Sequence, residues 1–138
     1  MSRNNDEIAL LRAQLQQLLE VTRIGTWTRD LPSGVLTLSD EVRALLEMPA
    51  ELAPSREAFL ARVLPEDRAR IVTTLDAAYA LGQDAEVRYR VRRGDGDVAQ
   101  FETRVRVICD AAGQPLRALG TVPDITQQCE TEARIQKQ

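Results

Sequence analysis

The chain contains no histidine, only two cysteines, and aromatic residues make up only 4% of its 138 residues. Histidine is the side chain whose unperturbed pKa lies nearest neutrality, and it serves serine and cysteine triads and many zinc and haem sites. Its absence excludes these chemistries from this chain. The sequence also shows no nucleophile paired with a base, so we expect no enzymatic activity.

Charge of one sign is not concentrated in any segment, because 18 basic and 21 acidic side chains are interspersed and give a net charge of −3. Nucleic-acid binding usually needs a basic patch or stacking aromatic rings, so we expect no nucleic-acid partner. No apolar run is long enough to span a bilayer, and the first residues lack the pattern of a signal peptide. Cys109 and Cys129 match no zinc spacing. We therefore expect one soluble, cytoplasmic domain with no membrane partner and no bound metal.

The N-terminal segment, residues 1–23, has the spacing of an amphipathic helix with a coiled-coil seam. Its apolar side chains recur at intervals of three and four residues. Two heptads are too short to pair firmly alone, so we expect a homodimer in which another part of the chain assists. A helix packed only on its own domain is the alternative. The predicted dimer-interface residues are Ile8, Leu11, Leu15 and Leu18.

A hairpin and a group of helices are predicted next. Two short extended runs flank the turn residues at 32–34. Ser39 or Asp40 can cap a helix that ends before Pro49, and Ser55 can cap a second one. Pro65 suits the first turn of a third helix, which is expected to continue to Gly82.

From residue 85 the apolar period changes from 3.6 to 2, which indicates strands. Three runs of alternating residues are separated by turn residues: the first is 85–92, the second carries Phe101, Thr103, Val105 and Val107 on one face, and the third is 116–122. Together with the hairpin they predict a five-stranded antiparallel sheet with the helices inserted between its second and third strands. The fold class is therefore α+β. A final helix, residues 127–138, follows Pro123.

These pieces, in this order, resemble a PAS domain of the sensory-box type with the C-terminal PAC motif. The resemblance covers residues 24–126. It is carried by Gly25-Thr-Trp27, Ser39-Asp40-Glu41, Val63-Leu-Pro-Glu-Asp67, Tyr89-Arg-Val-Arg-Arg-Gly-Asp-Gly96, Asp110-Ala-Ala-Gly113, and Gly120 followed by Asp124-Ile125-Thr126.

The resemblance implies a sensory and dimerisation module that relays a conformational signal to a C-terminal effector. Histidine kinases, diguanylate cyclases and transcription regulators carry such domains. It also implies that Asp124 and Thr126 form the signal-relay hinge between the sheet and the final helix, where Asp-x-Thr is independently a helix cap. The alternative is a structural coiled-coil and PAS dimerisation spacer that binds no ligand.

A PAS fold often holds a cofactor between its helices and sheet. A covalent flavin adduct is excluded because residues 40–82 contain no cysteine, and axial haem ligation by histidine is excluded as well. We expect no cofactor, since the predicted pocket is apolar enough to be a filled core; a non-covalent flavin and a small apolar or carboxylate ligand remain alternatives. The predicted pocket residues are Trp27, Leu45, Leu46, Phe59, Ile71, Leu75, Tyr89 and Phe101.

A row of arginines alternates along two neighbouring predicted strands. Such a row is typical of a solvated sheet face with cross-strand ion pairs, although it could also capture an anionic ligand or an acidic partner. The row consists of Arg88, Arg90, Arg92, Arg104 and Arg106.

Overall fold

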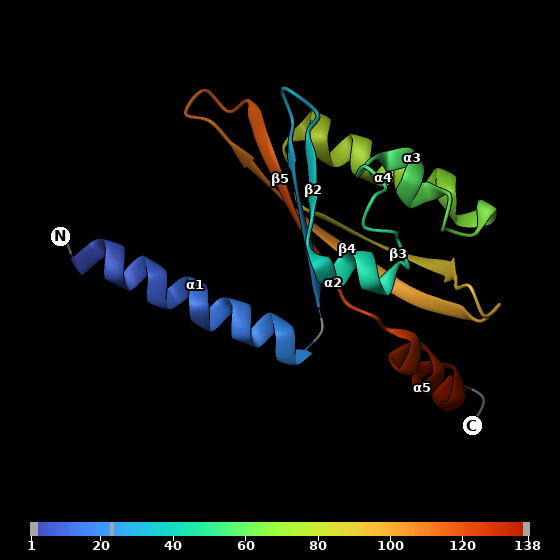
Figure 1. Ribbon diagram of the computed structural model, residues 1–138. Helices are drawn as coiled ribbons and strands as arrows, with labels where there is room; N and C mark the ends of the chain where they lie inside the picture. The colour runs from blue at the N-terminus through green and yellow to red at the C-terminus, as the bar shows by residue number, and fades with distance from the viewer. Residues whose placement is uncertain (1–2, 23, 137–138) are drawn as a thin grey trace.

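The computed structural model describes residues 3–22 and 24–136 (Figure 1). The remaining positions of the predicted N-terminal and C-terminal segments, 1–2, 23 and 137–138, lie outside the described residues. No helix in the described part is long and apolar enough to cross a membrane.

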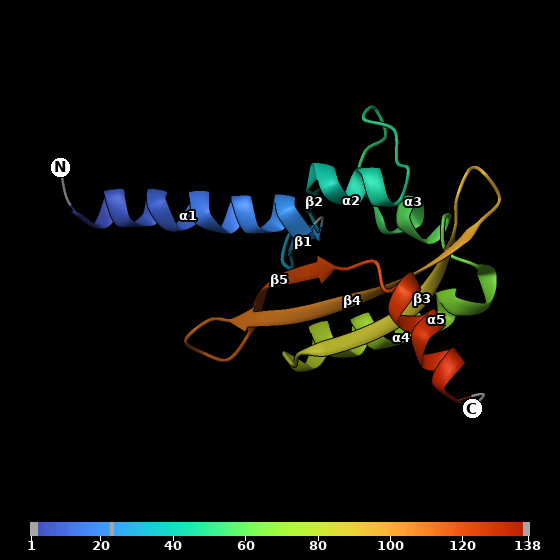
Figure 2. The same cartoon turned by 90° about the horizontal axis from the view of Figure 1, so that it is seen from below.

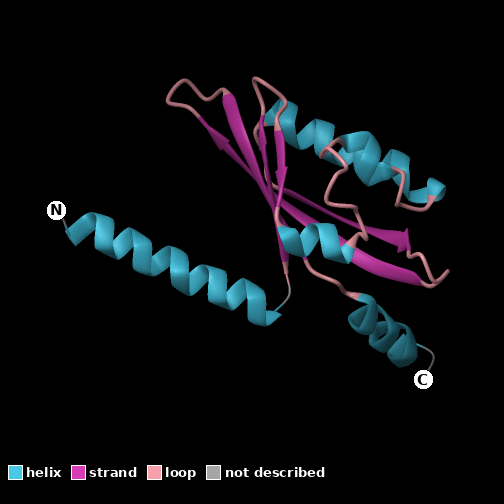
Figure 3. Ribbon diagram, viewed as in Figure 1, coloured by secondary structure: helices cyan, strands magenta, loops and turns pink. Residues whose placement is uncertain are grey.

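The centre of the molecule is one five-stranded antiparallel sheet with the strand order β2-β1-β5-β4-β3. Figure 3 shows it as a single twisted sheet with the terminal helices outside it. The predicted α+β fold is confirmed. The strands are β1 (Gly25–Asp30), β2 (Leu36–Leu38), β3 (Ala85–Arg92), β4 (Val98–Cys109) and β5 (Pro115–Val122).

The strands bury alternate residues on one face, as the period of two requires. On β3 the buried residues are Val87, Tyr89 and Val91, and on β4 they include Phe101 and Thr103. This face carries the hydrophobic core, and the arginine row lies on the opposite face.

Three helices between β2 and β3 cover the buried face: α2 (Asp40–Leu45), α3 (Arg56–Leu60) and α4 (Pro65–Leu81). The Ser39 hydroxyl accepts a hydrogen bond from the backbone N–H of Val42, and the Ser55 hydroxyl accepts one from Ala58. Pro65 begins α4, where it loses no helical hydrogen bond.

The open edge of β3 is covered by the chain that enters α4. The backbone N–H of Leu64 donates to the carbonyl of Arg90, and that of Arg92 donates to the carbonyl of Arg62. The Asp67 carboxylate accepts from the backbone N–H of Arg90 at 2.8 Å. An edge strand presents unpaired backbone groups, and these contacts satisfy part of that edge.

The two terminal helices, α1 (Arg3–Thr22) and α5 (Thr126–Gln136), flank the domain. Figures 1 and 2 show α1 extending away from the sheet, whereas α5 turns back beside β3 and β4. The domain therefore presents an exposed apolar stripe on α1, whereas α5 is held against the sheet.

Candidate functional site

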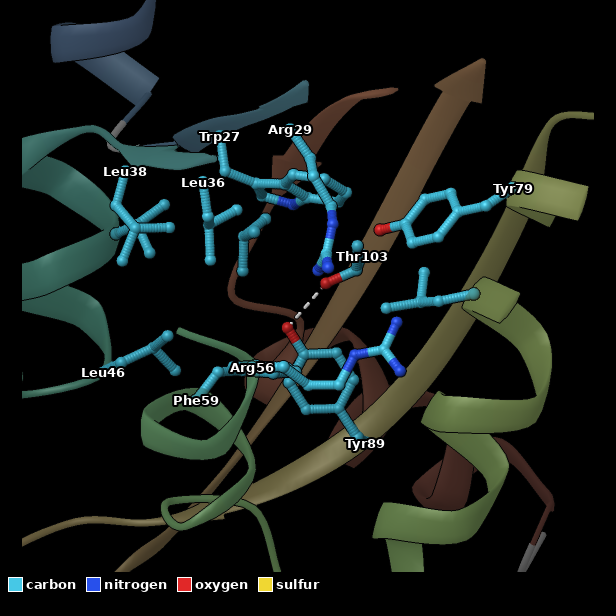
Figure 4. Close-up of a pocket in the computed structure, with 13 residues that line it drawn as sticks. Trp27, Arg29, Leu36, Leu38, Leu46, Arg56, Phe59, Tyr79, Tyr89 and Thr103 are labelled. Atoms are coloured by element: carbon cyan, nitrogen blue, oxygen red, sulfur yellow. Dashed lines mark hydrogen bonds between the residues drawn. The ribbon is translucent and has the colours of Figure 1, made fainter. Parts of the chain in front are cut away.

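A small cavity lies between the sheet and the helices. Its volume is about 60 Å³, and side chains from β1, β2, β3, β4, β5 and all three inserted helices line it (Figure 4). Most of its wall is apolar. The predicted pocket residues that line it are Trp27, Leu46, Phe59, Leu75 and Tyr89.

The other predicted pocket residues, Leu45, Ile71 and Phe101, do not line this cavity. Ile71 and Phe101 are almost fully buried in the core, and Leu45 packs against the core. Phe101 is enclosed because the ring of Tyr89 lies 6.4 Å from its own and the guanidinium of Arg93 lies over it. Alternation identified these side chains as inward-facing but could not separate filled from empty space.

Two buried hydroxyls meet at the wall of the cavity. Tyr89 and Thr103 hydrogen-bond to each other at 2.7 Å, and each is at most 4% exposed. Burial raises the pKa of the Tyr89 phenol well above its usual value, and the bond to Thr103 opposes this only in part. The phenol therefore stays protonated, and the pair provides a polar spot in an otherwise apolar interior.

The polar mouth of the cavity, which we define as Arg29, Arg56 and Tyr79, was not predicted from the sequence. The Arg29 guanidinium lies over the Tyr79 ring at 5.7 Å, and Arg56 pairs with Asp76 at 2.8 Å. Burial raises the pKa of the Tyr79 phenol, while the two nearby guanidinium groups act to lower it. All three residues also line a wide outer groove, so the mouth joins the cavity to the surface.

A signal for these residues was present in the sequence. Arg29 is two residues from Trp27 on a strand, and Tyr79 is four residues from Leu75 on a helix, so each shares a face with a predicted pocket residue. A polar end alone does not place such a residue at the solvent face, because a long side chain can lie along the core with its tip at the surface.

The predicted relay residues, Asp124 and Thr126, form an interlock with β4. The Asp124 carboxylate accepts hydrogen bonds from the backbone N–H of Thr126 at 2.9 Å and from its hydroxyl at 2.6 Å. Its other oxygen pairs with Arg93 at 3.1 Å. The Thr126 hydroxyl accepts from the backbone N–H of Gln100 at 2.9 Å. One cluster therefore ties the first residue of α5 to both the residue after β3 and the first part of β4.

A second cluster holds α5 against the outer face of the sheet. Arg88 on β3 pairs with Glu102 on β4 at 3.3 Å and with Glu132 on α5 at 3.2 Å. Glu102 is only 4% exposed, and Arg104 also pairs with it at 2.7 Å. Hydrogen bonds from Gln128 and Arg88 lower the pKa of Glu132. These arginines of the row form ion pairs, and one of them bridges to the final helix.

The predicted seam on α1 is exposed to solvent. Its residues carry exposed fractions of 47% for Ile8, 63% for Leu11, 56% for Leu15 and 60% for Leu18. Among the residues that the structure describes, none of these four side chains belongs to the core cluster, and Leu15 lines a groove with the outer face of the sheet.

The comparisons with known proteins agree on one fold. The sequence profile of the family described as the PAS fold matches residues 35–122. A blue-light-activated histidine kinase of Brucella anthropi is 30% identical over 120 residues, which are 87% of this chain and 24% of the relative. The chain thus spans about a quarter of the length of the curated relatives it matches.

Solved structures show the same fold. A sensory box histidine kinase/response regulator from Burkholderia thailandensis aligns with a TM-score of 0.68 and 25% identity, covering 89% of this chain and 92% of that one. The N-terminal domain of a diguanylate cyclase with a PAS/PAC sensor from Marinobacter aquaeolei also gives a TM-score of 0.68, at 24% identity, covering 76% and 97%.

Proposed function

Because the chain belongs to the PAS fold family, a family of sensory modules found in signalling proteins, we propose that it relays a conformational change through α5 to a C-terminal effector. The fold is a sensory module and is not itself catalytic, and we propose that this chain has no enzymatic activity of its own. The curated relatives are longer than this chain. We propose that the effector is a kinase, a cyclase or a regulator. Cys109 and Cys129 are both free thiols, which supports a cytoplasmic location.

The observation that carries this proposal is the double attachment of α5. The helix begins at the Asp124–Thr126 interlock and is held again, about two turns later, by the ion pair between Arg88 and Glu132. Both attachments are polar, partly exposed and therefore of modest strength. A population shift requires a bias of only a few kcal/mol between two states, so such contacts can be broken and remade by a signal in the sheet.

Replacing Asp124 with alanine is expected to loosen α5 at a cost of about 1 kcal/mol, the usual value of a helix cap. Amide hydrogen exchange across residues 126–136 should then become about fivefold faster. Asp110→Ala is the matched control, since Asp110 accepts similar backbone hydrogen bonds from Ala112 and Gln114 in the turn between β4 and β5. Unchanged exchange in α5, or an equal change in the Asp110 variant, would contradict the relay.

We propose further that the chain is a homodimer paired through α1. Four apolar side chains are exposed to solvent along α1. A second copy of the chain can bury them, and each Å² of apolar surface so buried contributes roughly 25 cal/mol to association. Pairing of α1 alone would be weak, so the proposal includes contact through the neighbouring outer face of the sheet.

The combined substitution Leu11→Glu and Leu18→Glu is expected to convert the dimer to a monomer, because it places charges in the seam. Size-exclusion chromatography with light scattering at tens of micromolar protein measures the mass. Leu81→Glu with Leu116→Glu is the matched control, since both leucines are exposed on the domain, at 66% and 41%. A monomeric unmodified protein would refute the proposal.

We propose that the cavity holds no resident flavin or haem. A cavity of about 60 Å³ is several times smaller than the roughly 300–1,000 Å³ of typical cofactor sites. Trp27, Phe59 and Tyr89 line this small space, so a large planar group could enter only if they moved. The same small volume favours the second candidate function, a ligand-free dimerisation spacer, which predicts no response of α5 to anything that enters the cavity.

A further inference from the structure

We propose that the cavity binds a small monocarboxylic acid, with its carboxylate between Arg29 and Arg56 and its apolar body against Trp27 and Phe59. This inference rests on the proposed sensory function and names the chemical class of the signal. Three observations support it: the positive charge of the residues that line the cavity, the lack of a counter-ion beside Arg29, and the connection of the cavity to the surface.

The lining of the cavity contains two cationic side chains, Arg29 and Arg56, and no anionic one. Figure 4 shows both guanidinium ends and the Tyr79 hydroxyl pointing into the space between the sheet and the helices. A cavity whose wall is otherwise apolar has a low local dielectric, so this unbalanced charge attracts an anion more strongly there than on an open surface. A carboxylate is the small organic anion that a guanidinium binds with two parallel hydrogen bonds.

Arg29 is the cation that lacks a counter-ion. Among the described residues its guanidinium makes no ion pair and no hydrogen bond, and its one recorded partner is the ring face of Tyr79. Arg29 is partly buried, and no acceptor among the described residues lies beside its guanidinium. A carboxylate beside it would restore the missing acceptors, and the protonated Tyr79 phenol could donate a further hydrogen bond.

Arg56 provides a connection between the ligand and the helices. It lies on α3 and pairs at 2.8 Å with Asp76 on α4, a carboxylate that is 55% exposed. A bound carboxylate would share the Arg56 guanidinium with Asp76 and so weaken a contact that joins the two helices. Occupancy of the cavity would thereby change the packing of the face that covers the sheet.

The ligand has a direct route of entry. The polar mouth and Leu36 line both the cavity and the outer groove, whose volume is about 830 Å³. The groove also carries Glu57 and Asp76. Because Asp76 is already paired with Arg56, the uncompensated positive charge at the mouth is that of Arg29. The small cavity restricts the body of the ligand to a few carbon atoms, as in a short aliphatic or a simple aromatic acid.

The experiment titrates butyrate, hexanoate and benzoate into the purified chain and follows the fluorescence of Trp27, which is the only tryptophan and lines the cavity. Calorimetry supplies the same constants independently. At least one acid should bind saturably with a Kd below about 1 mM. Its neutral counterpart of the same shape, butyramide, hexanamide or benzamide, should bind at least about tenfold more weakly, since it cannot form the charged pair.

Arg29→Gln should weaken binding of that acid by about tenfold or more, and Arg56→Gln by a smaller factor, because Asp76 already neutralises part of its charge. Arg117→Gln is the matched control: it removes the same charge from the neighbouring strand, one residue from the Arg29 partner Ala118. Its Kd should stay within about twofold. Thermal unfolding checks that each variant folds. If Arg29→Gln does not fold, Arg29→Lys, which keeps the charge, provides a second test.

The proposal is overturned if no acid binds up to about 10 mM, if the amides bind as tightly as the acids, or if Arg117→Gln weakens binding as much as Arg29→Gln. These outcomes concern the cavity alone. The relay is tested separately by hydrogen exchange in the Asp124→Ala variant, so a cavity that binds no acid and an α5 that does not respond are distinct results.

Discussion

Replacing Gly120 with alanine is expected to lower the free energy of unfolding by about 2–3 kcal/mol, a large effect for a single methyl group. A Cβ atom at this position would lie 2.1 Å from Cε2 and 2.2 Å from Nε1 of Trp27, far inside any real contact. Gly120 pairs with Trp27 across the β1–β5 ladder and with Val105 on the other side. The backbone is held from both sides, so the indole must move. Urea unfolding followed by circular dichroism measures the loss.

Two comparisons separate this clash from the general cost of changing a glycine. In Gly94→Ala the new Cβ would meet only the flexible end of Glu47, at 3.3 Å, so the loss should stay below about 1 kcal/mol. In the Trp27→Leu background, Gly120→Ala should cost clearly less than in the unmodified protein, because the atoms it meets are gone. Equal costs in both backgrounds would show that the indole does not set the requirement for glycine.

The same pair of residues shows which part of the fold the sequence could predict. Alternation from Val87 to Val91 and from Phe101 to Val107 indicated two strands and their buried faces, and these are the faces observed. Ser39, Ser55 and Pro65 indicated where helices begin, because a cap or a first-turn proline acts within a few residues. Such local rules do not reveal that Gly120 lies under Trp27, since the two residues are 93 positions apart in the sequence.

The sequence predicted the apolar residues of the candidate site but not its polar residues. Trp27, Phe59 and Tyr89 follow from periodicity alone. Arg29 and Arg56 lie 27 positions apart in the sequence, and they line the same cavity only because the fold brings β1 and α3 to its wall. A charged residue at an inward-facing position is assigned to solvent unless something shows where its guanidinium ends, and that depends on tertiary structure.

The role of Asp67 is a similar case, because in the sequence it was only the last residue of the Val63-Leu-Pro-Glu-Asp67 piece that resembles a PAS domain. In the structure it is 3% exposed and binds the Arg90 guanidinium through two nitrogens, each at 3.0 Å, in addition to the Arg90 backbone N–H. One carboxylate therefore joins the start of α4 to the edge strand of the sheet. The charged groups belong to segments that only the fold brings together.

Asp67→Asn is expected to lower the free energy of unfolding at neutral pH by about 2–3 kcal/mol, since it removes the charge from a buried carboxylate that accepts three hydrogen bonds from Arg90. Asparagine can still accept from the Arg90 backbone N–H, but its amide nitrogen would face the guanidinium as a second donor. Chemical unfolding measured between pH 7 and pH 2 tests this, with Glu66→Gln as the matched control. Glu66 is 68% exposed and lies 3.9 Å from Arg90, so its loss should be below about 0.5 kcal/mol.

The pH dependence gives the sharper test of Asp67. Its hydrogen bonds to Arg90 hold the pKa of its carboxyl below the usual value, although burial acts in the opposite direction. A folded-state pKa below that of the unfolded chain means that this contribution is fully present above about pH 4 and is lost as the pH falls through the folded-state value. The unmodified protein should therefore lose stability in acid more steeply than Asp67→Asn, and the two curves should converge there. Parallel curves over the whole range would show that the ionised carboxylate is not what fastens α4 to the edge of the sheet.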